Sequence, residues 1–285
     1  MSFRSLGLAR YSRQWAAVFC IVLLSALAFA AEPPPLQMGV FPYLSSERLF
    51  RTFLPMKDYL EAQLKRRIVM TTAPDFKTFV QRVARGDYDF YYTAPHLALL
   101  AETEYGHRRV SRVTRELDAH VYVRRNSPVQ RIEDLRGRSV ISSDALAMIS
   151  LLGEKLLRDH GLRPGRDYRL ERTASHNNAF LTVSRGEAAA VFGGGAVFER
   201  SPPDVRRELR ILASAPVVPH TMIMAHPRLP AAEYARLKLA LLAFTRDGPG
   251  RQFFETTNFG DMGSITDADM DPLRPFLKDL KERLK

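Results

Sequence analysis

Histidine, methionine and hydroxyl side chains are the groups in this sequence that could carry chemistry, and they occur singly rather than in a dense motif. Imidazole and thioether groups suit a soft metal ion, and those that fall near predicted strand and helix ends are His96, His176, His220, Met148, Met222 and Met224. They lack the spacing of a metal-ligand motif, and alternating methionines in a strand usually pack in a core. We therefore expect no metal, although the sequence leaves open whether the three histidines converge on one.

Enzyme motifs are also missing from the sequence. The glycines at residues 193–195 lack the lysine and hydroxyl residue of a phosphate-binding loop, so a tight turn is the simplest interpretation. Ser142 and Ser143 are not followed by a nucleophile-elbow pattern, and the acidic residues are dispersed. A histidine and a carboxylate in one cleft could still support hydrolysis, which predicts a turnover that is lost when His176 is replaced. We expect a protein that is not an enzyme and needs no cofactor.

Aromatic and polar side chains at the ends of predicted strands are better explained as ligand contacts. Tyr43 and Tyr92 lie at strand ends, where a phenol can face a ligand, although an aromatic side chain there can also belong to the core. His96 lies at a helix start, and His176 lies between a strand and a helix. Asn177 either hydrogen-bonds a ligand or caps the helix that follows it.

The elements that must position these residues alternate between strands and helices. The first set has strands predicted over residues 36–40, 67–72 and 88–92, with helices over 46–53, 55–64, 75–86 and 95–101. The second has strands over 119–123, 139–142, 168–171 and 188–192, with helices over 146–160 and 178–185, and further strands over 210–213 and 221–224. This order predicts an α/β fold in which mostly parallel sheets are flanked by helices.

Two such sets, followed by a returning C-terminal part, predict two lobes. The first lobe is discontinuous and comprises residues 31–118 and 221–285, and the second comprises residues 119–220. Ligands of open α/β sheets bind beyond the carboxyl ends of the strands. We therefore expect a ligand cleft between the lobes that closes by a hinge.

The first thirty residues are typical of an export signal. Three arginines precede an apolar run over residues 15–30, which ends in Ala28-Phe29-Ala30 and is followed by three prolines. The run is short for a membrane span of about 20 residues, so a cleavable signal peptide over residues 1–30 is favoured over an uncleaved anchor. The single cysteine, Cys20, lies within it. The mature chain is thus expected to be periplasmic and free of disulfides.

Charge narrows the possible partners. The chain has 42 Lys and Arg against 31 Asp and Glu, a formal net charge of +11. An exported basic protein favours an anionic ligand or an anionic membrane surface. Because the arginines are scattered along the chain, a generally basic proteome explains the charge as well. No run of basic residues has the aromatic spacing of a nucleic-acid surface, so nucleic acid is not expected as a partner.

Four blocks of residues, in order and in register, resemble one family. They are GVFPY at residues 39–43, GDYDFYYTAP at 86–95, IEDLRGRSV at 132–140 and SHNN at 175–178. Together they are similar to the phosphate-, phosphite- and phosphonate-binding proteins of ABC importers, over nearly the whole mature chain. The resemblance implies a periplasmic binding protein of the type II fold, a small ligand, a membrane permease as partner and a monomer.

The same resemblance implies particular ligand contacts and shows where this chain departs from the pattern. A pocket tyrosine of the family matches Phe76, a second pocket aromatic matches Tyr92, the family's ligand-contacting histidine matches His176, and Thr221 is nearest to an acidic position. The hydroxyl residues that hold the family's oxyanion at a helix N-terminus fall on Ala147, Met148 and Ile149. Hydroxyls remain nearby only at Ser142, Ser143 and Ser150.

This departure changes the expected ligand. Each charge-assisted hydrogen bond to an oxyanion contributes about 1.5–3 kcal/mol, so losing three hydroxyls should weaken phosphonate binding strongly. An organic ligand with an apolar body and a small anionic head fits better. The sequence leaves the ligand's identity open. It also leaves open whether the protein feeds an importer or reports ligand occupancy to a membrane histidine kinase.

Overall fold

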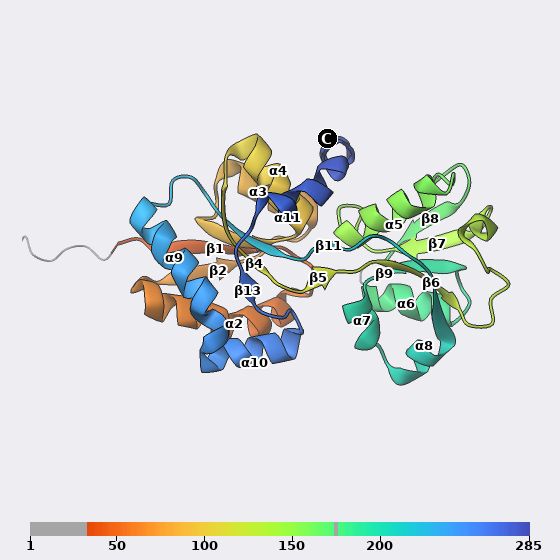
Figure 1. Cartoon of the computed structure of the whole chain (residues 1–285), viewed down its shortest axis with the longest axis horizontal. Helices are drawn as coiled ribbons and strands as arrows, with labels where there is room; N and C mark the ends of the chain where they lie inside the picture. Colours follow the sequence, from red (N-terminus) through yellow and green to blue (C-terminus); the bar gives the residue numbers. More distant parts are fainter. Residues whose placement is uncertain (1–32, 174–175) are drawn as a thin grey trace, which may run out of the picture. The chain divides into compact units, whose positions relative to one another are not determined.

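Two β-sheets organise the chain in the computed structural model, which describes residues 33–173 and 176–285. The predicted signal peptide over residues 1–30 lies outside the described residues, as does the side chain of His176. The first sheet has the strand order β13-β4-β12-β3-β1-β2, and its strands β1, β2, β4 and β13 are labelled in Figure 1. Its strands are β1 (Leu36–Val40), β2 (Ile68–Thr71), β3 (Phe90–Thr93), β4 (Arg108–Val113), β12 (Met222–Ala225) and β13 (Met262–Gly263).

The second sheet has the order β10-β6-β9-β7-β8. Its strands are β6 (His120–Arg124), β7 (Ser139–Ser142), β8 (Arg169–Arg172), β9 (Ala190–Gly193) and β10 (Leu209–Ser214). A short antiparallel pair, β5 (Glu116–Leu117) with β11 (Val218–Pro219), lies where the chain passes from strands of the first sheet to strands of the second and back (Figure 1).

The α/β class is as predicted, but the prediction of mostly parallel sheets is corrected. In the first sheet β1 pairs in parallel with β2 and β3, whereas β12 is antiparallel to both β3 and β4. In the second, β7 is parallel to β8 and β9, whereas β6 is antiparallel to β9 and β10. Both sheets are therefore mixed, because strands without a crossover helix enter each sheet in the opposite direction.

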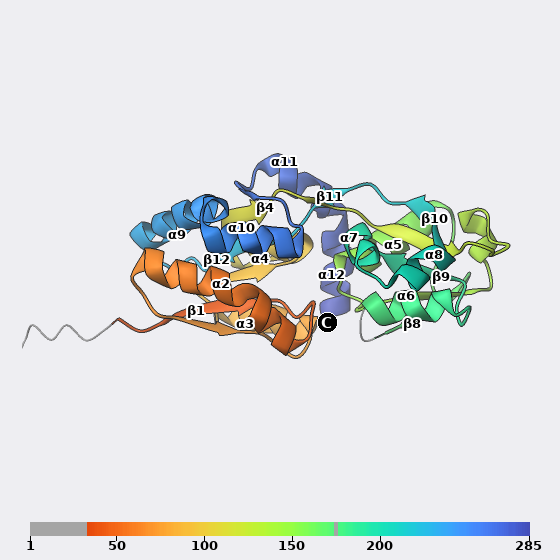
Figure 2. The same cartoon turned by 90° about the horizontal axis from the view of Figure 1, so that it is seen from below.

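Helices lie between most consecutive strands, and two of them follow the last strand, β13. They are α2 (Ser46–Leu64), α3 (Phe76–Arg85), α4 (Pro95–Tyr105), α5 (Met148–Asp159), α6 (His176–Ser184), α7 (Gly195–Glu199), α8 (Pro203–Glu208), α9 (Ala231–Ala243), α10 (Gly248–Thr257), α11 (Asp267–Met270) and α12 (Leu277–Leu284). Short 3₁₀ segments cover η1 (Ile132–Leu135), η2 (Phe244–Arg246) and η3 (Asp271–Phe276). Helix α2 packs against α9 and α10 (Figure 2). Among the described helices, none combines the length and the apolar character needed to cross a membrane.

One difference from the expected elements concerns Pro55. Two helices were predicted, with Pro55 beginning the second, but α2 runs through this residue without a break. A proline inside a helix removes one backbone hydrogen bond. The buried side chains along α2 recur at helical spacing on both sides of it, and they are Leu49, Phe53, Met56, Leu60 and Leu64. Burial of this continuous apolar face keeps the helix intact.

Replacing Gly153 by alanine is expected to lower the free energy of unfolding by about 1–3 kcal/mol. A Cβ atom at this position of α5 would lie 2.3 Å from the ring of Phe192, which is fully buried on β9. Alanine usually stabilises a helix interior over glycine by about 0.5–1 kcal/mol. A lower free energy of unfolding in Gly153→Ala would therefore result from the overlap between the new Cβ atom and the Phe192 ring. Urea unfolding followed by circular dichroism measures it. The control is Gly248→Ala, where the nearest atom is 4.0 Å from the added Cβ, and equal effects at the two sites would contradict the assignment.

Candidate functional site

An aromatic cluster lies where β1 and β3 end. These strands are parallel neighbours, so their carboxyl ends lie at the same edge of the sheet. The ring of Phe41 stacks on Tyr43 with centroids 4.7 Å apart, and Phe53 on α2 lies 4.7 Å from Tyr92. Phe76, which begins α3, contacts Phe41 edge-on at 5.6 Å. These rings belong to the hydrophobic core, in which Phe53 and Tyr92 are almost completely buried and Tyr43 is half-buried. The phenols of Tyr43 and Tyr92 are the polar groups among them.

Strand β12 adds polar groups to this cluster. Because β12 pairs with β3, Thr221 just before it lies beside Tyr92, and the two hydroxyls hydrogen-bond each other. His220 places Nδ1 3.2 Å from the Thr221 hydroxyl. The ring of Phe259 lies 4.9 Å from His220 and stacks on Tyr92 at 6.4 Å. Residues from three distant parts of the chain thus meet at one edge of the sheet.

Tyr43 carries a hydroxyl that is buried and finds no hydrogen-bond partner among residues 33–173 and 176–285. Burial raises the pKa of this phenol, and the nearby Arg200 and Arg48 act in the opposite direction. The hydroxyl therefore stays protonated at neutral pH and can donate. Buried tyrosine hydroxyls usually find a partner, so an unpartnered one at this edge indicates a group that a ligand can satisfy.

His96 has an unfilled hydrogen-bond acceptor, whereas Tyr43 has an unfilled donor. The ring is fully buried, and Nε2 lies 2.8 Å from the carbonyl oxygen of Leu146. A carbonyl oxygen can only accept, so Nε2 carries the hydrogen and Nδ1 is left as an acceptor. Nδ1 is buried, and none of the residues that the structure describes is its hydrogen-bond partner. Burial lowers the pKa of His96 to about 4, which keeps the ring neutral at neutral pH.

The first residues of α5 and the residue before it are apolar and buried. Ala147, Met148 and Ile149 are all buried. The hydroxyls of Ser142 and Ser150 lie 2.6 Å apart, and Ser150 also lies 2.8 Å from the carbonyl oxygen of Asp144. These hydroxyls are therefore occupied by partners within the protein.

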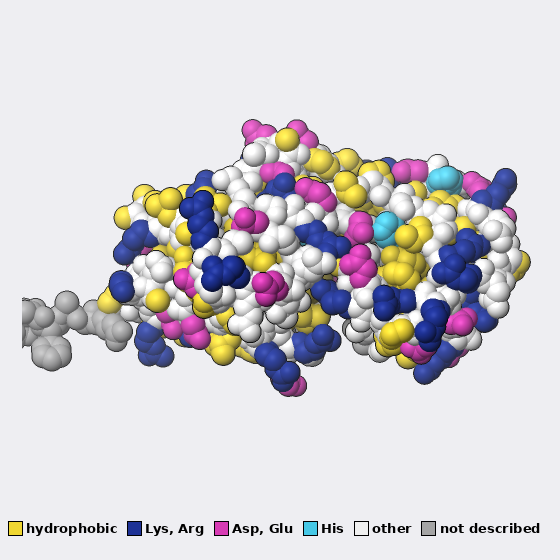
Figure 3. Space-filling model, turned by 60° about the horizontal axis from the view of Figure 1, so that its bottom comes forward, with side chains coloured by type: hydrophobic (Ala, Val, Ile, Leu, Met, Phe, Trp, Pro, Cys, Tyr) yellow, Lys and Arg dark blue, Asp and Glu magenta, His cyan; other side chains and the backbone are white. Residues whose placement is uncertain are grey.

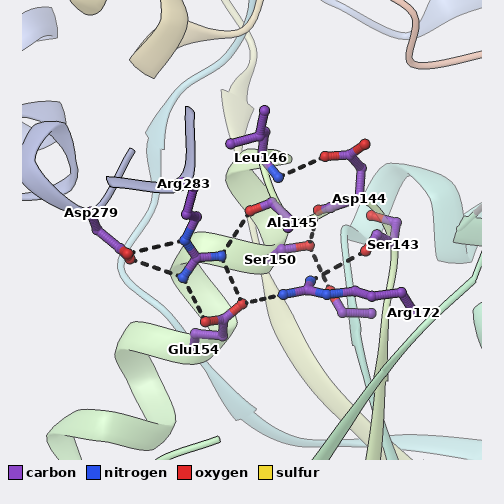
Figure 4. A network of polar contacts seen from close by, with 10 residues as sticks. Ser143, Asp144, Ala145, Leu146, Ser150, Glu154, Arg172, Asp279 and Arg283 are labelled. Carbon is purple, nitrogen blue, oxygen red and sulfur yellow. Dashed lines mark hydrogen bonds and ion pairs between the residues drawn. The ribbon is translucent and has the colours of Figure 1, made fainter. Parts of the chain in front are cut away.

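Ion pairs hold the loop before α5 in place (Figure 4). Arg283 of α12 donates to the carbonyl oxygen of Ala145 at 2.8 Å and to Glu154 Oε2 at 2.7 Å. Glu154 is 4% exposed and also accepts from Arg172 of β8 at 2.7 Å, while Asp279 is a second partner of Arg283 at 3.0 Å. Two arginines and two carboxylates thus balance their charges around the beginning of α5.

The three glycines at 193–195 have a packing role instead of forming a tight turn. Gly193 ends β9, Gly194 precedes α7 and Gly195 begins it, and none has a positive φ. The backbone N–H of Gly195 donates to Asp118 Oδ1 at 3.1 Å, and a Cβ there would lie 2.2 Å from Asp118 Oδ2. Glycine is required because the carboxylate approaches the backbone too closely for a side chain.

The residues proposed from sequence fall into two groups. Tyr43, Phe76, Tyr92 and Thr221 meet in the aromatic cluster, while His96, Ser142, Ser143 and Met148 lie around the loop before α5 and its first turn. Asn177 is exposed in the first turn of α6. Sequence reasoning missed Phe259 and Phe53, because their approach to Tyr92 depends on contacts between distant segments.

The described residues offer no metal site, and the charged side chains on the surface are mixed. Residues 33–173 and 176–285 contain no group of three or more histidine, cysteine or acidic side chains able to hold a metal. On the face drawn in Figure 3, Lys and Arg side chains are scattered over the whole surface with acidic side chains between them.

Comparison with known proteins identifies a family and shows that the fold occurs elsewhere. A family model described as the periplasmic substrate-binding protein of phosphonate ABC transporters matches residues 38–270. A binding-protein component of an ABC phosphonate transporter from Pseudomonas aeruginosa is 14% identical, with a TM-score of 0.75 over 88% of this chain and 89% of that one.

Two further solved structures have similar folds. PhnD1 of Prochlorococcus marinus, solved with methylphosphonate, is 15% identical, with a TM-score of 0.75 over 86% of this chain and 98% of that one. A protein of Xanthomonas citri solved with chloride is 19% identical, with a TM-score of 0.72 over 87% of this chain and 99% of that one.

Proposed function

This chain belongs to the family of periplasmic substrate-binding proteins of phosphonate ABC transporters, and on that premise we propose that it captures a small organic anion beside the aromatic cluster of β1 and β3. The family delivers solutes to membrane permeases and is not a family of enzymes. A periplasmic location follows from family membership. Export by a signal peptide over residues 1–30 remains part of the proposal.

The observation that carries the proposal is the Tyr43 hydroxyl, which is buried near the ends of β1 and β3 and has no partner in the described part of the chain. An oxyanion would accept its hydrogen. The unpartnered Nδ1 of His96 would accept from an O–H or N–H group of the ligand. Together they favour a ligand that offers both an acceptor and a donor.

The start of α5 limits the ligand further. Ala147, Met148 and Ile149 offer no hydroxyl, and those of Ser142 and Ser150 pair with each other. Each missing charge-assisted hydrogen bond removes about 1.5–3 kcal/mol. We therefore expect methylphosphonate to bind more weakly than an anion whose larger apolar body packs on the half-buried ring of Tyr43.

The proposed clamp has two lobes, residues 31–118 with 221–285 and residues 119–220. Strands of the first sheet all come from the first two ranges and strands of the second sheet from the third, which supports the division. The β5–β11 pair lies at both crossings and would act as the hinge. Proposed ligand contacts are Tyr43, Phe76, Tyr92, His96, Ser142, Ser143, Met148, His176, Asn177 and Thr221.

Replacing Tyr43 by phenylalanine is expected to reduce ligand affinity at least tenfold without lowering the unliganded melting temperature. The variant removes a donor to an anion, and such a bond contributes about 1.5–3 kcal/mol. The hydroxyl has no partner within the protein, so its loss should not destabilise the fold. Thermal-shift titrations with phosphate, methylphosphonate, larger phosphonates, sulfonates, carboxylates and metal salts measure both effects, because a ligand stabilises by RT ln(1 + [L]/Kd).

The matched control is Tyr168→Phe. Its hydroxyl is also buried and unpartnered, but it lies just before β8 of the second sheet, so ligand binding should not change. If Tyr43→Phe binds every responding anion as tightly as the unmodified protein, the proposed site is wrong. A shift confined to metal salts would favour a metal ligand instead.

A further inference from the structure

Two arginines meet at the C-terminal end of α10. Arg200, directly after α7, donates from Nη1 to the carbonyl oxygen of Thr257 at 3.0 Å. Arg115, between β4 and β5, donates from Nη1 to the next carbonyl, that of Asn258, at 3.2 Å. The carbonyl end of a helix attracts cations, and here it brings together guanidinium groups that are far apart in the sequence.

This pair borders the aromatic cluster. The backbone N–H of Arg115 donates to the carbonyl oxygen of Phe259 at 3.1 Å, and the Phe259 ring is the one that contacts His220 and Tyr92. Burial is the main cause that lowers the pKa of His220 to about 4, and the charges of Arg115 and Arg200 act in the same direction. Both guanidinium groups therefore lie near enough to His220 to disfavour its protonated form.

The positive charge of the pair is incompletely balanced. Arg115 lies 3.6 Å from Glu199, whose side chain is 59% exposed. Arg200 has no ion pair with any carboxylate of the described residues. Asp118, the nearest acid to act on His220, is engaged by the Gly195 N–H and by His120 Nε2 at 3.2 Å. A guanidinium has five N–H donors, so the carbonyls of α10 leave several of them for a ligand.

We infer that Arg115 and Arg200 hold the oxyanion of the ligand, in place of hydroxyl groups at the start of α5. This inference rests on the proposed function and adds the residues that make the site prefer a negatively charged ligand to a neutral one. A guanidinium fork matches carboxylate, sulfonate and phosphonate oxygens alike. The ligand class is accordingly an organic oxyanion whose apolar body lies beside the half-buried ring of Tyr43, and carboxylates belong to it as well as phosphonates.

The test uses three probes that share an apolar body, namely phenylphosphonate, phenylacetate and the neutral phenylacetamide. Affinities are measured by isothermal titration for the unmodified protein, Arg115→Gln and Arg200→Gln. Each variant should lose about ten- to hundredfold in affinity for the two anions, while binding of the amide stays unchanged. Glutamine keeps an N–H donor for the α10 carbonyls, and Arg200→Lys should recover part of the affinity because it restores the charge.

The matched control is Arg236→Gln, which removes an exposed arginine of α9 and should leave all affinities unchanged. Unchanged anion binding in both arginine variants, or an equal loss for the amide, overturns the inference. If the inference is overturned but Tyr43→Phe still binds the anions more weakly, the proposed site stands. Only the assignment of Arg115 and Arg200 as the residues that hold the oxyanion is then wrong. Failure of the unmodified protein to bind either anion at millimolar concentration contradicts both.

Discussion

Replacing Glu154 by alanine is expected to lower the free energy of unfolding by about 3–5 kcal/mol. Glu154 is 4% exposed and lies between Arg283 and Arg172, each 2.7 Å from one of its oxygens. Its removal leaves two guanidinium groups facing each other, of which Arg283 is only 18% exposed and keeps Asp279 alone as a carboxylate partner. A buried charge without its partner is costly because neither water nor a counter-charge replaces the lost interaction.

Urea denaturation followed by circular dichroism measures this loss. The matched control is Asp159→Ala on the same helix, where the pair with Lys155 is exposed by 54% and 40% respectively. Exposed pairs contribute between zero and about 1 kcal/mol, so the control should shift little. Similar losses in the two variants would show that the Glu154 network does not stabilise the loop before α5.

The protein is expected to lose stability as the pH falls from 6.5 towards 4. Burial is the largest cause that lowers the pKa of His96, His107 and His220 to about 4 in the folded state, whereas an unfolded histidine titrates near 6.5. Between these values the unfolded chain binds more protons than the folded one. Protons therefore favour unfolding, and the stability that is present above pH 6.5 is lost as the pH approaches 4.

His96 offers the cleanest test because its ring is fully buried. Its shift corresponds to about 3 kcal/mol between pH 6.5 and 4. Urea midpoints at pH 7, 5.5 and 4.5 should fall steeply for the unmodified protein and less for His96→Gln, which keeps a donor for the Leu146 carbonyl. A pH-independent midpoint would contradict the assignment of neutral buried histidines.

Local patterns in the sequence were enough to predict the order of the elements. Strand β1 and helix α3 follow from apolar spacing and from the caps at Asp75 and Gly86, which the structure confirms. Such signals act over a few residues, because helix caps and buried faces depend on near neighbours. Strand β4 was missed. Its sequence RRVSRV is rich in arginine, and only Val110, Ser111 and Val113 are buried.

Long-range pairing was beyond the reach of these patterns. The antiparallel entry of β12 between β3 and β4 joins residues more than a hundred positions apart. A strand has the same periodicity in either direction, so its sequence does not specify whether it pairs in parallel or antiparallel. The expectation of mostly parallel sheets was wrong for this reason.

Some features of the candidate site could also be predicted from the sequence, whereas others depended on the tertiary structure. The sequence by itself determined the family resemblance, the aromatic residues at the ends of β1 and β3, and the loss of hydroxyls at Ala147, Met148 and Ile149. Only the tertiary structure decided that the Tyr43 hydroxyl and His96 Nδ1 are buried without partners. It also decided that Phe259 contacts Tyr92 and His220, and that Arg115 and Arg200 donate to neighbouring carbonyl oxygens at the end of α10. The physical reason is that burial and hydrogen-bond satisfaction depend on every segment packed around a group, whereas residue type and spacing are written in one segment alone.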